Sequence, residues 1–222
     1  MTNSIIAKNL KSIVSSLPKD VQLVAVSKTK PSSYIQEAYD AGQRDFGENR
    51  IQEMAEKYEL LPKDIRWHMI GHVQGNKMKY MAPFVHMVHG MDKEKRFKEL
   101  NKEALKNNRI INCLVQIHIA QEESKFGFSF EEAEEFLEKD LKTIYSNLNI
   151  CGLMGMATNT QDEKVVAEEF SSLNSFFLKC QKKSPSSQFN ILSIGMSGDY
   201  LLAVEQGSNM VRIGSSIFGS RG

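Results

Sequence analysis

The sequence predicts an α/β fold, a single (β/α)8 TIM barrel that spans residues 1–222 as one domain. Eight short runs with strand character recur along the chain, separated by segments with helix signals. The runs are Val21–Ser27, Arg44–Gly47, Trp67–Gly71, Met87–Met91, Ile111–Ala120, Ile150–Met156, Asn190–Gly195 and Met210–Gly214. Runs that are apolar on both faces, such as Leu23-Val24-Ala25-Val26, are typical of parallel sheets covered by helices. This alternation of strands and helices favours a closed barrel.

Helix signals lie in the intervals between the runs. They are capping boxes at Ser33/Gln36, Ser129/Glu132 and Thr160/Glu163, with stop glycines at Gly42 and Gly207. A doubly wound open sheet is the alternative, but it would normally carry a glycine-rich turn after its first strand. Here that turn reads Lys28-Thr29-Lys30-Pro31. No repeat or linker divides the chain, so we expect one domain.

Three segments carry apolar residues at helical spacing. Residues 2–17 lack acidic side chains and are weakly similar to a mitochondrial presequence, but a helix that packs on the domain and ends at Pro18 is favoured. Its apolar face would hold Ile5, Ile6, Leu10, Ile13, Val14 and Leu17. The charge-rich segments Lys93–Arg109, with Phe97, Leu100 and Leu105, and Glu131–Asp140 are interpreted as helices with solvated outer faces.

Composition excludes several classes of protein. The 28 basic and 27 acidic residues nearly cancel, unlike the charge of proteins that bind nucleic acid or anionic membranes. No apolar run approaches the roughly 18 residues of a membrane-spanning helix. Cys113, Cys151 and Cys180 show no CxxC spacing, so we expect a reducing compartment and a cytoplasmic protein. The five histidines form no HxxxH pair, and we predict no metal site.

Lys28 is the first candidate for chemistry. Functional side chains of this fold lie at the C-terminal ends of the strands, and the first run closes on Lys28. Burial against apolar side chains would lower the pKa of its amine and make it a nucleophile for an aldehyde. Lys30 would share the same face if the strand continued, so the pattern does not choose between the two lysines. A lysine at the protein surface is the ordinary alternative.

Two turns near the C-terminus predict a phosphate site. The segment 210–219 reads as a strand that passes through Gly214 into a short helix beginning with serines, and Gly195-Met196-Ser197-Gly198-Asp199 closes the preceding run. Backbone N–H groups at a helix start favour an anion, and TIM barrels commonly hold phosphate after strands seven and eight. Either turn alone is a common way to leave a strand, but their positions together favour the site.

Arg212 shares a strand face with Met210 and Gly214, which points its side chain into the barrel mouth. A buried arginine needs a partner, so the structural alternative is a salt bridge with an acidic residue. The functional alternative is a contact with the ligand. A guanidinium beside a pyridine nitrogen keeps its own proton and leaves that nitrogen unprotonated.

Five segments, in chain order, match a known family. They are Val26-Ser27-Lys28-Thr29-Lys30-Pro31, Phe46-Gly47-Glu48-Asn49, Trp67-His68-Met69-Ile70-Gly71 with Gln74 and Asn76-Lys77, Gly195-Met196-Ser197 with Asp199, and Arg212-Ile213-Gly214 with Ile217-Phe218-Gly219. Together they resemble the pyridoxal phosphate homeostasis proteins, from Leu23 nearly to the C-terminus. The resemblance implies a barrel of the alanine racemase N-terminal domain type and pyridoxal 5′-phosphate as the cofactor.

The resemblance also implies roles for individual residues. The first of the two lysines would carry the cofactor as a Schiff base, which selects Lys28 over Lys30. Asn49 would lie against the cofactor ring, Arg212 would meet the pyridine nitrogen, and Ser197, Gly214 and Ser215 would contact the phosphate. The expected cofactor-binding residues are therefore Lys28, Asn49, Met196, Ser197, Arg212, Gly214 and Ser215.

The sequence departs from the family pattern at two positions. Ser215 stands where threonine is common, which keeps the hydroxyl. His118 stands where asparagine is usual, and we interpret it first as a hydrogen-bonded barrel residue and only second as a proton carrier.

Three functions are weighed. The resemblance implies a non-catalytic carrier or buffer of pyridoxal phosphate in intracellular vitamin B6 homeostasis, with transient contacts to apoenzymes that use the cofactor. The alternative is an amino-acid racemase, which adds a β-domain and a tyrosine from the partner subunit. The sequence ends at Gly222 without room for that domain, so we expect negligible turnover and a monomer. The third is a sugar-phosphate enzyme that forms a substrate imine on Lys28, which would be colourless.

Overall fold

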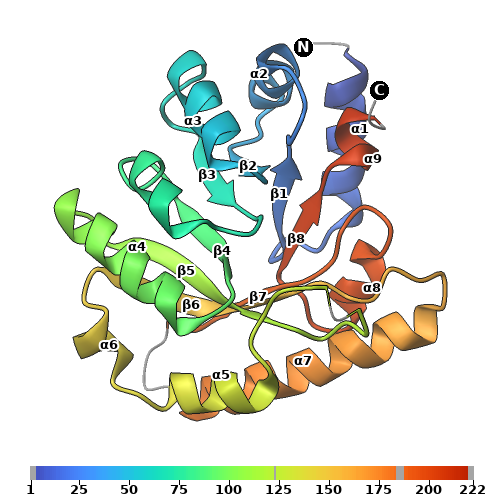
Figure 1. The fold of residues 1–222 in the computed structure, drawn as a ribbon. Coiled ribbons are helices and arrows are strands. Elements are labelled where there is room, and N and C mark those ends of the chain that lie inside the picture. Colours follow the sequence, from blue (N-terminus) through green and yellow to red (C-terminus); the bar gives the residue numbers. More distant parts are fainter. Residues whose placement is uncertain (1–3, 123, 184–187, 220–222) are drawn as a thin grey trace.

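The computed structural model describes residues 4–122, 124–183 and 188–219, and its strands close into a barrel in chain order, β1 to β8 (Figure 1). Every neighbouring pair of strands is parallel, including β1 with β8, which closes the ring. The strands are β1 (Gln22–Val26), β2 (Asp45–Glu48), β3 (Arg66–Met69), β4 (Met87–Met91), β5 (Ile111–Ile117), β6 (Leu148–Gly155), β7 (Ile191–Ser193) and β8 (Met210–Ile213). The predicted barrel is confirmed.

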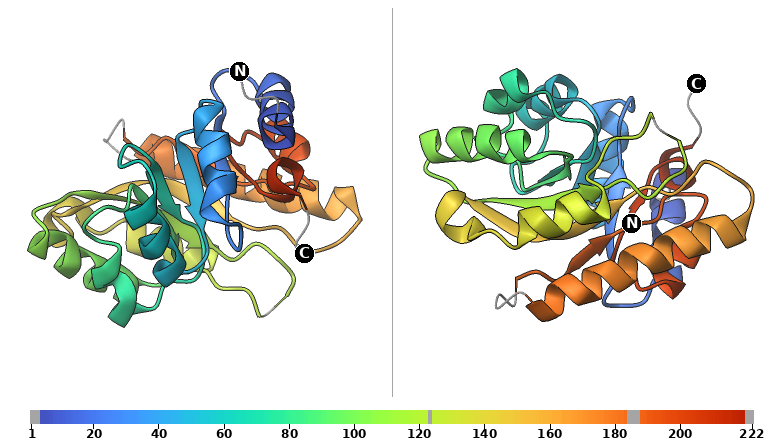
Figure 2. Two further views of the ribbon diagram at one scale, coloured as in Figure 1. Left: turned by 90° about the horizontal axis from the view of Figure 1, so that it is seen from above. Right: turned by 60° about the horizontal axis from the view of Figure 1, so that its bottom comes forward.

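Helices surround the strands on the outside of the barrel (Figure 2). They are α1 (Ile5–Ser16), α2 (Ser32–Asp40), α3 (Ile51–Leu60), the 3₁₀ helix η1 (Gly75–Tyr80), α4 (Glu94–Lys106), α5 (Phe130–Leu137), α6 (Leu141–Ile144), α7 (Glu163–Lys183), α8 (Tyr200–Glu205) and α9 (Ser215–Phe218). The N-terminal helix α1 packs against α9, where the Asn9 side-chain amide donates to the Ile217 carbonyl at 3.1 Å. The first helix therefore supports the last one, which follows β8.

The apolar core has two parts. The larger part lies between the strands and the helices and includes Trp67 and Phe97, both fully buried. The smaller part is the barrel interior, an apolar cluster of Val24, Met87, Leu114, Cys151, Met154 and Met210. Because strand side chains alternate between faces, His89 on the strand of Met87 and Arg212 on the strand of Met210 also point into this interior. Buried polar side chains therefore lie inside an otherwise apolar barrel interior.

Several helix predictions hold and others are wrong. The capping box of Ser129 and Glu132 is confirmed in both directions. The box at Ser33 is wrong, because α2 begins at Ser32 behind Pro31 and has no side-chain cap. The box at Thr160 is also wrong, because α7 begins later, at Glu163, and the side chain of Asp162 accepts the Lys164 N–H.

The predicted apolar faces need smaller corrections. Helix α1 does end before Pro18 and buries Ile6, Leu10 and Ile13, but Ile5 and Val14 are exposed. In α4 the buried residue near the end is Ala104, whereas Leu105 is exposed. Only about three or four residues in every two turns of a surface helix face the core. Apolar residues at the edge of that face, such as Ile5, Val14 and Leu105, are therefore exposed to solvent.

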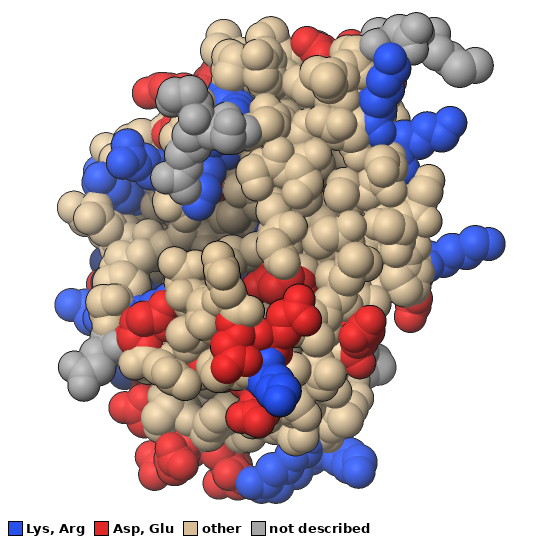
Figure 3. All heavy atoms as spheres, turned by 90° about the vertical axis from the view of Figure 1, so that its right-hand side faces the viewer, with Lys and Arg blue, Asp and Glu red and all other residues tan. Residues whose placement is uncertain are grey.

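Most strands end one to three residues earlier than predicted, and β5 and β7 show why. Strand β5 stops at Ile117, because the His118 N–H then donates to the Phe128 carbonyl of the following loop. Strand β7 stops at Ser193, before the turn at Gly195, whose φ of +95° lies in the left-handed region. Among the described helices, none has the length and apolar content needed to cross a membrane. On the face in Figure 3, acidic side chains gather in the lower part and basic ones lie along the edges, so that face has no continuous basic surface.

Candidate functional site

Lys28 lies in a tight turn at the C-terminal end of β1. The Lys30 N–H donates to the Ser27 carbonyl at 3.0 Å, which closes the turn around Lys28 and Thr29. Thr29 has a φ of +64°, a left-handed conformation that is uncommon for a β-branched residue. Lys28 itself is half-buried. The turn stops the strand and places this lysine at the mouth of the barrel, as predicted.

A buried ion cluster from β2 and α3 holds this turn from below. Lys57 Nζ donates to the Ser27 carbonyl at 2.8 Å, to Glu48 Oε1 at 2.7 Å and to Glu53 Oε1 at 2.7 Å. The Ser27 hydroxyl donates to the same Glu48 oxygen at 2.6 Å. Glu53 also accepts the Thr29 N–H at 2.6 Å, which offsets the strain of the left-handed residue. The conformation of the Lys28 turn thus depends on residues outside it.

Glu48 is the most constrained group of this cluster. It is fully buried, and burial raises the pKa of its carboxyl, although the Lys57 ammonium opposes that shift. Its Oε2 makes no hydrogen bond within the described residues. Glu48 belongs to one of the segments that resemble the family, but its partner Lys57 was not predicted from the sequence. The signal was an apolar α3 face that contains Ile51, Met54 and Lys57 at helical spacing.

The two turns of the predicted phosphate site meet in space. The Gly214 N–H donates to Ser197 Oγ at 3.1 Å. A Cβ atom added to Gly214 would lie 3.0 Å from the Val26 carbonyl oxygen, so only glycine lets this turn approach the end of β1 so closely. The N–H groups of Ser215 and Ser216 donate to no acceptor among the described residues, as expected of the first turn of a helix.

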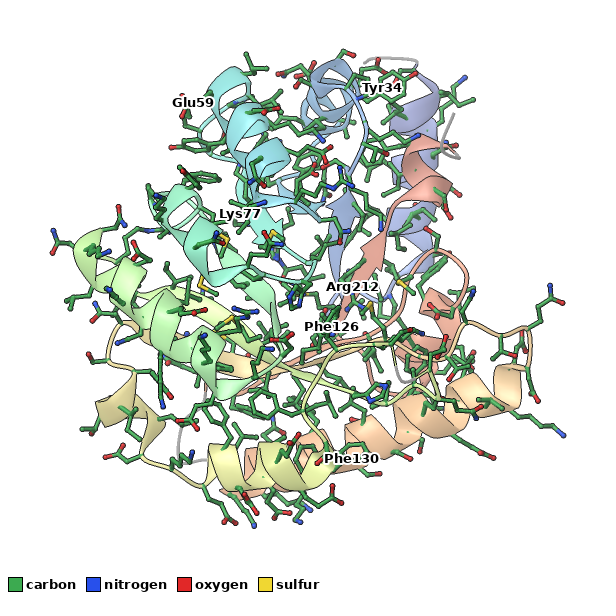
Figure 4. All side chains as sticks on the ribbon, viewed as in Figure 1. Tyr34, Glu59, Lys77, Phe126, Phe130 and Arg212 are labelled. Carbon is green, nitrogen blue, oxygen red and sulfur yellow. The ribbon has the colours of Figure 1, made fainter. Side chains whose placement is uncertain are left out.

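Arg212 is buried, with 3% of its surface exposed, and it lies at the centre of the fold (Figure 4). Its guanidinium donates to the Ser193 carbonyl at 2.7 Å, to Ser193 Oγ at 2.7 Å and to the Gly155 carbonyl at 3.0 Å. Burial lowers its pKa to about 10. Within the described part of the chain it forms no salt bridge, although Asp199 attracts it electrostatically and opposes the lowering of its pKa.

The remaining predicted residues lie at the same end of the barrel. Asn49 directly follows β2, and its side-chain oxygen lies only 2.5 Å from the position of a Cβ on Gly71. Met196 follows β7, is 39% exposed and donates its N–H to Asp199 at 2.5 Å. Because β1 lies between β2 and β8, the strand ends that carry Lys28, Asn49 and Gly214 are neighbours. Contacts of these residues with a cofactor stay predictions.

His118 is hydrogen-bonded within its own loop. Its Nε2 lies 2.9 Å from the Glu122 carbonyl, and its backbone N–H donates to Phe128. This arrangement agrees with the first interpretation of His118, a hydrogen-bonded residue at the end of β5. The proton-carrier interpretation stays a prediction.

One group of side chains has atoms close enough to surround a metal ion. It consists of Asp45, His68 and His86, whose ligand-type atoms all lie within 4.8 Å of one another. Both oxygens of Asp45, however, already accept from the Arg66 guanidinium, at 2.7 and 2.6 Å. A dication there would face a fixed positive charge. The absence of a metal site in this protein stays a prediction.

Comparisons with known proteins agree on one family. The family model of the alanine racemase N-terminal domain matches residues 3–222. The pyridoxal phosphate homeostasis protein of Vibrio alginolyticus is 39% identical over 92% of this chain and 88% of its own length. That of Escherichia coli K12 is 36% identical over 92% of this chain and 87% of its own.

Solved structures give the same result. PipY of Synechococcus elongatus without pyridoxal phosphate superposes with a TM-score of 0.91 at 33% identity, covering 96% of this chain and all of PipY. PipY with pyridoxal phosphate bound has a TM-score of 0.85. Alanine racemase of Bartonella henselae, at 16% identity and a TM-score of 0.75, shares the fold over 58% of its length. The chain therefore belongs to the family of pyridoxal phosphate homeostasis proteins, which has the barrel of the alanine racemase N-terminal domain.

Proposed function

We propose that this protein binds pyridoxal 5′-phosphate as a Schiff base on Lys28 and acts in vitamin B6 homeostasis as a carrier or buffer of the cofactor. The observation that carries the proposal is the convergence of Lys28, Arg212 and the Ser197–Gly214 contact at one end of the barrel. A relative with the same fold, PipY, has pyridoxal phosphate bound in one of its structures.

The residues at this end fit the chemical groups of the cofactor. Lys28 supplies the amine for the aldehyde. Ser197 and the unpaired N–H groups of Ser215 and Ser216 offer donors to a dianionic phosphate. Arg212 has a donor for the pyridine nitrogen, because its Nε–H bonds no acceptor among the described residues. Asn49 and Met196 lie beside these groups and would contact the ring and the phosphate turn.

The carrier role follows from what this set of residues lacks. Of the seven expected cofactor-binding residues, only Lys28 and Arg212 carry a charged side chain, and arginine keeps its proton, which leaves Lys28 as the one acid/base group of the set. A single acid/base group is sufficient to form the Schiff base and to release it again. Release would supply apoenzymes through transient contacts, and the protein would act as a cytoplasmic monomer. The relatives, which are named homeostasis proteins, support this reading.

The proposal is tested by loading purified protein with pyridoxal 5′-phosphate and recording its absorbance. A yellow protein is expected, and borohydride reduction followed by peptide mapping should place the label on Lys28. Lys28→Ala should abolish the yellow absorbance, whereas the matched variant Lys30→Ala should keep it. A colourless wild-type protein would remove the proposal and favour a sugar-phosphate enzyme, and a label on Lys30 would overturn the assignment of the lysine.

A further inference from the structure

Among the described residues, no carboxylate forms a hydrogen bond or a salt bridge with the buried Arg212 cation, and the acid that attracts it electrostatically is Asp199 in the turn after β7. All its acceptors, namely the Ser193 carbonyl, the Ser193 hydroxyl and the Gly155 carbonyl, are neutral. Removing a guanidinium from water without a counterion is unfavourable, and this cost is visible in the lowered pKa of Arg212. Asp199 offsets only part of this cost, because the pKa of Arg212 stays lowered, and the groups that Arg212 contacts are the other route by which it can be compensated.

A chain of hydrogen bonds leads from Arg212 to a carboxylate at the other end of the barrel. Ser193 Oγ lies 3.2 Å from His89 Nδ1, and His89 Nε2 lies 3.0 Å from His68 Nδ1. His68 Nε2 lies 3.1 Å from Asp45 Oδ1, at the start of β2. Ser193, His89 and His68 are all fully buried. The chain joins five strands, β8, β7, β4, β3 and β2, across the barrel interior.

The two ends of this chain determine the direction of every bond in it. Arg212 can only donate, so Ser193 Oγ accepts from it and donates its own proton to His89 Nδ1. His89 is then protonated at Nε2 and donates to His68 Nδ1. His68 in turn donates from Nε2 to Asp45, which as a carboxylate can only accept. With both histidines neutral, this is the arrangement in which each contact joins one donor to one acceptor.

The surroundings of His89 and of the neighbouring His86 favour their neutral forms. His89 is surrounded by the barrel interior and faces His68 and Arg212, and burial holds its pKa well below the usual value. His68 also faces His86, whose ring centre lies 5.3 Å away, and the Asp45–Arg66 pair. Burial and the neighbouring His68 lower the pKa of His86 to about 4, so at neutral pH it adds no charge. The fixed charges at the two ends of the chain are therefore the Arg212 cation and the Asp45 carboxylate, which also pairs with Arg66.

We propose that Asp45, His68, His89 and Ser193 are positioning residues that hold the Arg212 guanidinium at the ring nitrogen of pyridoxal phosphate and polarise it from the far end of the barrel. The inference rests on the proposed function, because it takes Arg212 as the partner of the pyridine nitrogen. Hydrogen bonds in series at low dielectric strengthen one another. Removing the hydrogen bonds of His68 should therefore make Arg212 a weaker hydrogen-bond donor and hold its guanidinium less firmly in place. None of the four positioning residues needs to touch the cofactor.

The test compares two cofactors that differ only at the ring position facing Arg212. These are pyridoxal 5′-phosphate and its 1-deaza analogue, which has a carbon in place of the ring nitrogen. Wild-type protein should bind the natural cofactor about tenfold more tightly, the size of one charge-assisted hydrogen bond. His68→Leu should remove most of this preference. His68→Gln, whose amide both donates and accepts, should restore part of it, and His86→Leu, the same change on the neighbouring ring outside the chain, should leave it intact.

The outcomes separate the inference from the proposed function. If His68→Leu weakens both cofactors equally, His68 has only a structural role and the inference is overturned. If wild-type protein binds both cofactors equally well, Arg212 does not meet the ring nitrogen, and the inference fails while cofactor binding stands. No binding of either cofactor would remove the proposed function itself. Should His68→Leu fail to fold, Ser193→Ala removes a single oxygen of the chain and gives the same comparison.

Discussion

The Gly214 N–H donates to Ser197 Oγ at 3.1 Å, which ties the turn after β8 to the turn after β7. This bond links residues that lie 17 positions apart in the chain. It orients the Ser197 oxygen beside the first N–H groups of α9, so both turns present donors at one place. The predicted phosphate site therefore depends on two strand ends and not on the start of α9 alone.

We expect the phosphate group to contribute much of the noncovalent affinity. Ser197→Ala should weaken binding of pyridoxal 5′-phosphate about tenfold, because it removes a donor to a dianion and the partner of Gly214. Binding of pyridoxal, which lacks the phosphate, should change little in the same variant. Fluorescence titration with both ligands measures this, with Ser172→Ala on α7 as a control. Equal affinity of wild-type protein for the two ligands would contradict the phosphate site.

The ion cluster below Lys28 should be a large contribution to stability. Lys57→Met leaves the buried Glu48 carboxylate without its cation, and we expect a loss of about 3 kcal/mol in the free energy of unfolding. The double variant Glu48→Gln/Lys57→Met should lose less, because no charge remains buried alone. Urea unfolding of the cofactor-free protein measures both. Lys63→Met, which breaks an exposed pair with Glu59, should change stability by less than about 1 kcal/mol; a similar loss there would argue against a special role for the cluster.

Stability should fall between pH 7 and pH 5. The pKa values of His89 and His86 are depressed by burial, in His86 to about 4, whereas the histidines of the unfolded chain take up protons near their ordinary pKa of 6.5. Below that value the unfolded state binds more protons than the folded state, so stability decreases as pH falls. We expect a decrease of about 2 kcal/mol for each of the two histidines over this range. His86→Gln should reduce the pH dependence in urea unfolding, and a flat profile in wild-type protein would show that these histidines are not depressed.

Asp45 makes stability depend on pH in a second, more acidic range. The hydrogen bonds of His68 and Arg66 outweigh burial and hold the pKa of this carboxyl well below its usual value. Its contribution to stability is present above the unfolded value of 3.8 and is lost as pH falls below it. The pH range in which Asp45 affects stability lies below that of the histidines, so unfolding curves between pH 5 and pH 7 do not contain its contribution.

Loaded protein should exchange and racemise amino acids negligibly. An arginine donor leaves the ring nitrogen unprotonated, which makes the ring a weaker electron sink, and Lys28 would have to act without a second acid/base group. Loss of such a group typically costs about 10²–10⁴-fold in rate. Deuterium incorporation at Cα of alanine, together with chiral analysis, measures the reaction. Turnover near about 1 per second or faster would instead favour the racemase alternative.

The order of elements was readable from the sequence alone. Each of the eight strands lies within or close to a run that was visible as an apolar segment, because strands covered by helices must be apolar on both faces. Lys28 and Gly214 were found for the same reason, because both lie just beyond the end of a strand: Lys28 comes two residues after β1, and Gly214 directly follows β8. Local spacing also pointed Arg212 inward. What depends on neighbours in the chain, namely periodicity, turns and strand ends, could be predicted.

Only the tertiary structure decided which polar groups meet. Lys57 reaches Glu48 and the Ser27 carbonyl because α3 packs behind β2, and no local spacing encodes that contact. The five residues from Asp45 to Arg212 lie on five different strands, so their chain of hydrogen bonds exists only when the barrel closes. Burial gives these contacts their energy, because a polar group inside the barrel must find a partner there or lose the hydrogen bonds it made to water. A sequence read in one dimension shows the polar residues, but closure of the barrel selects their partners.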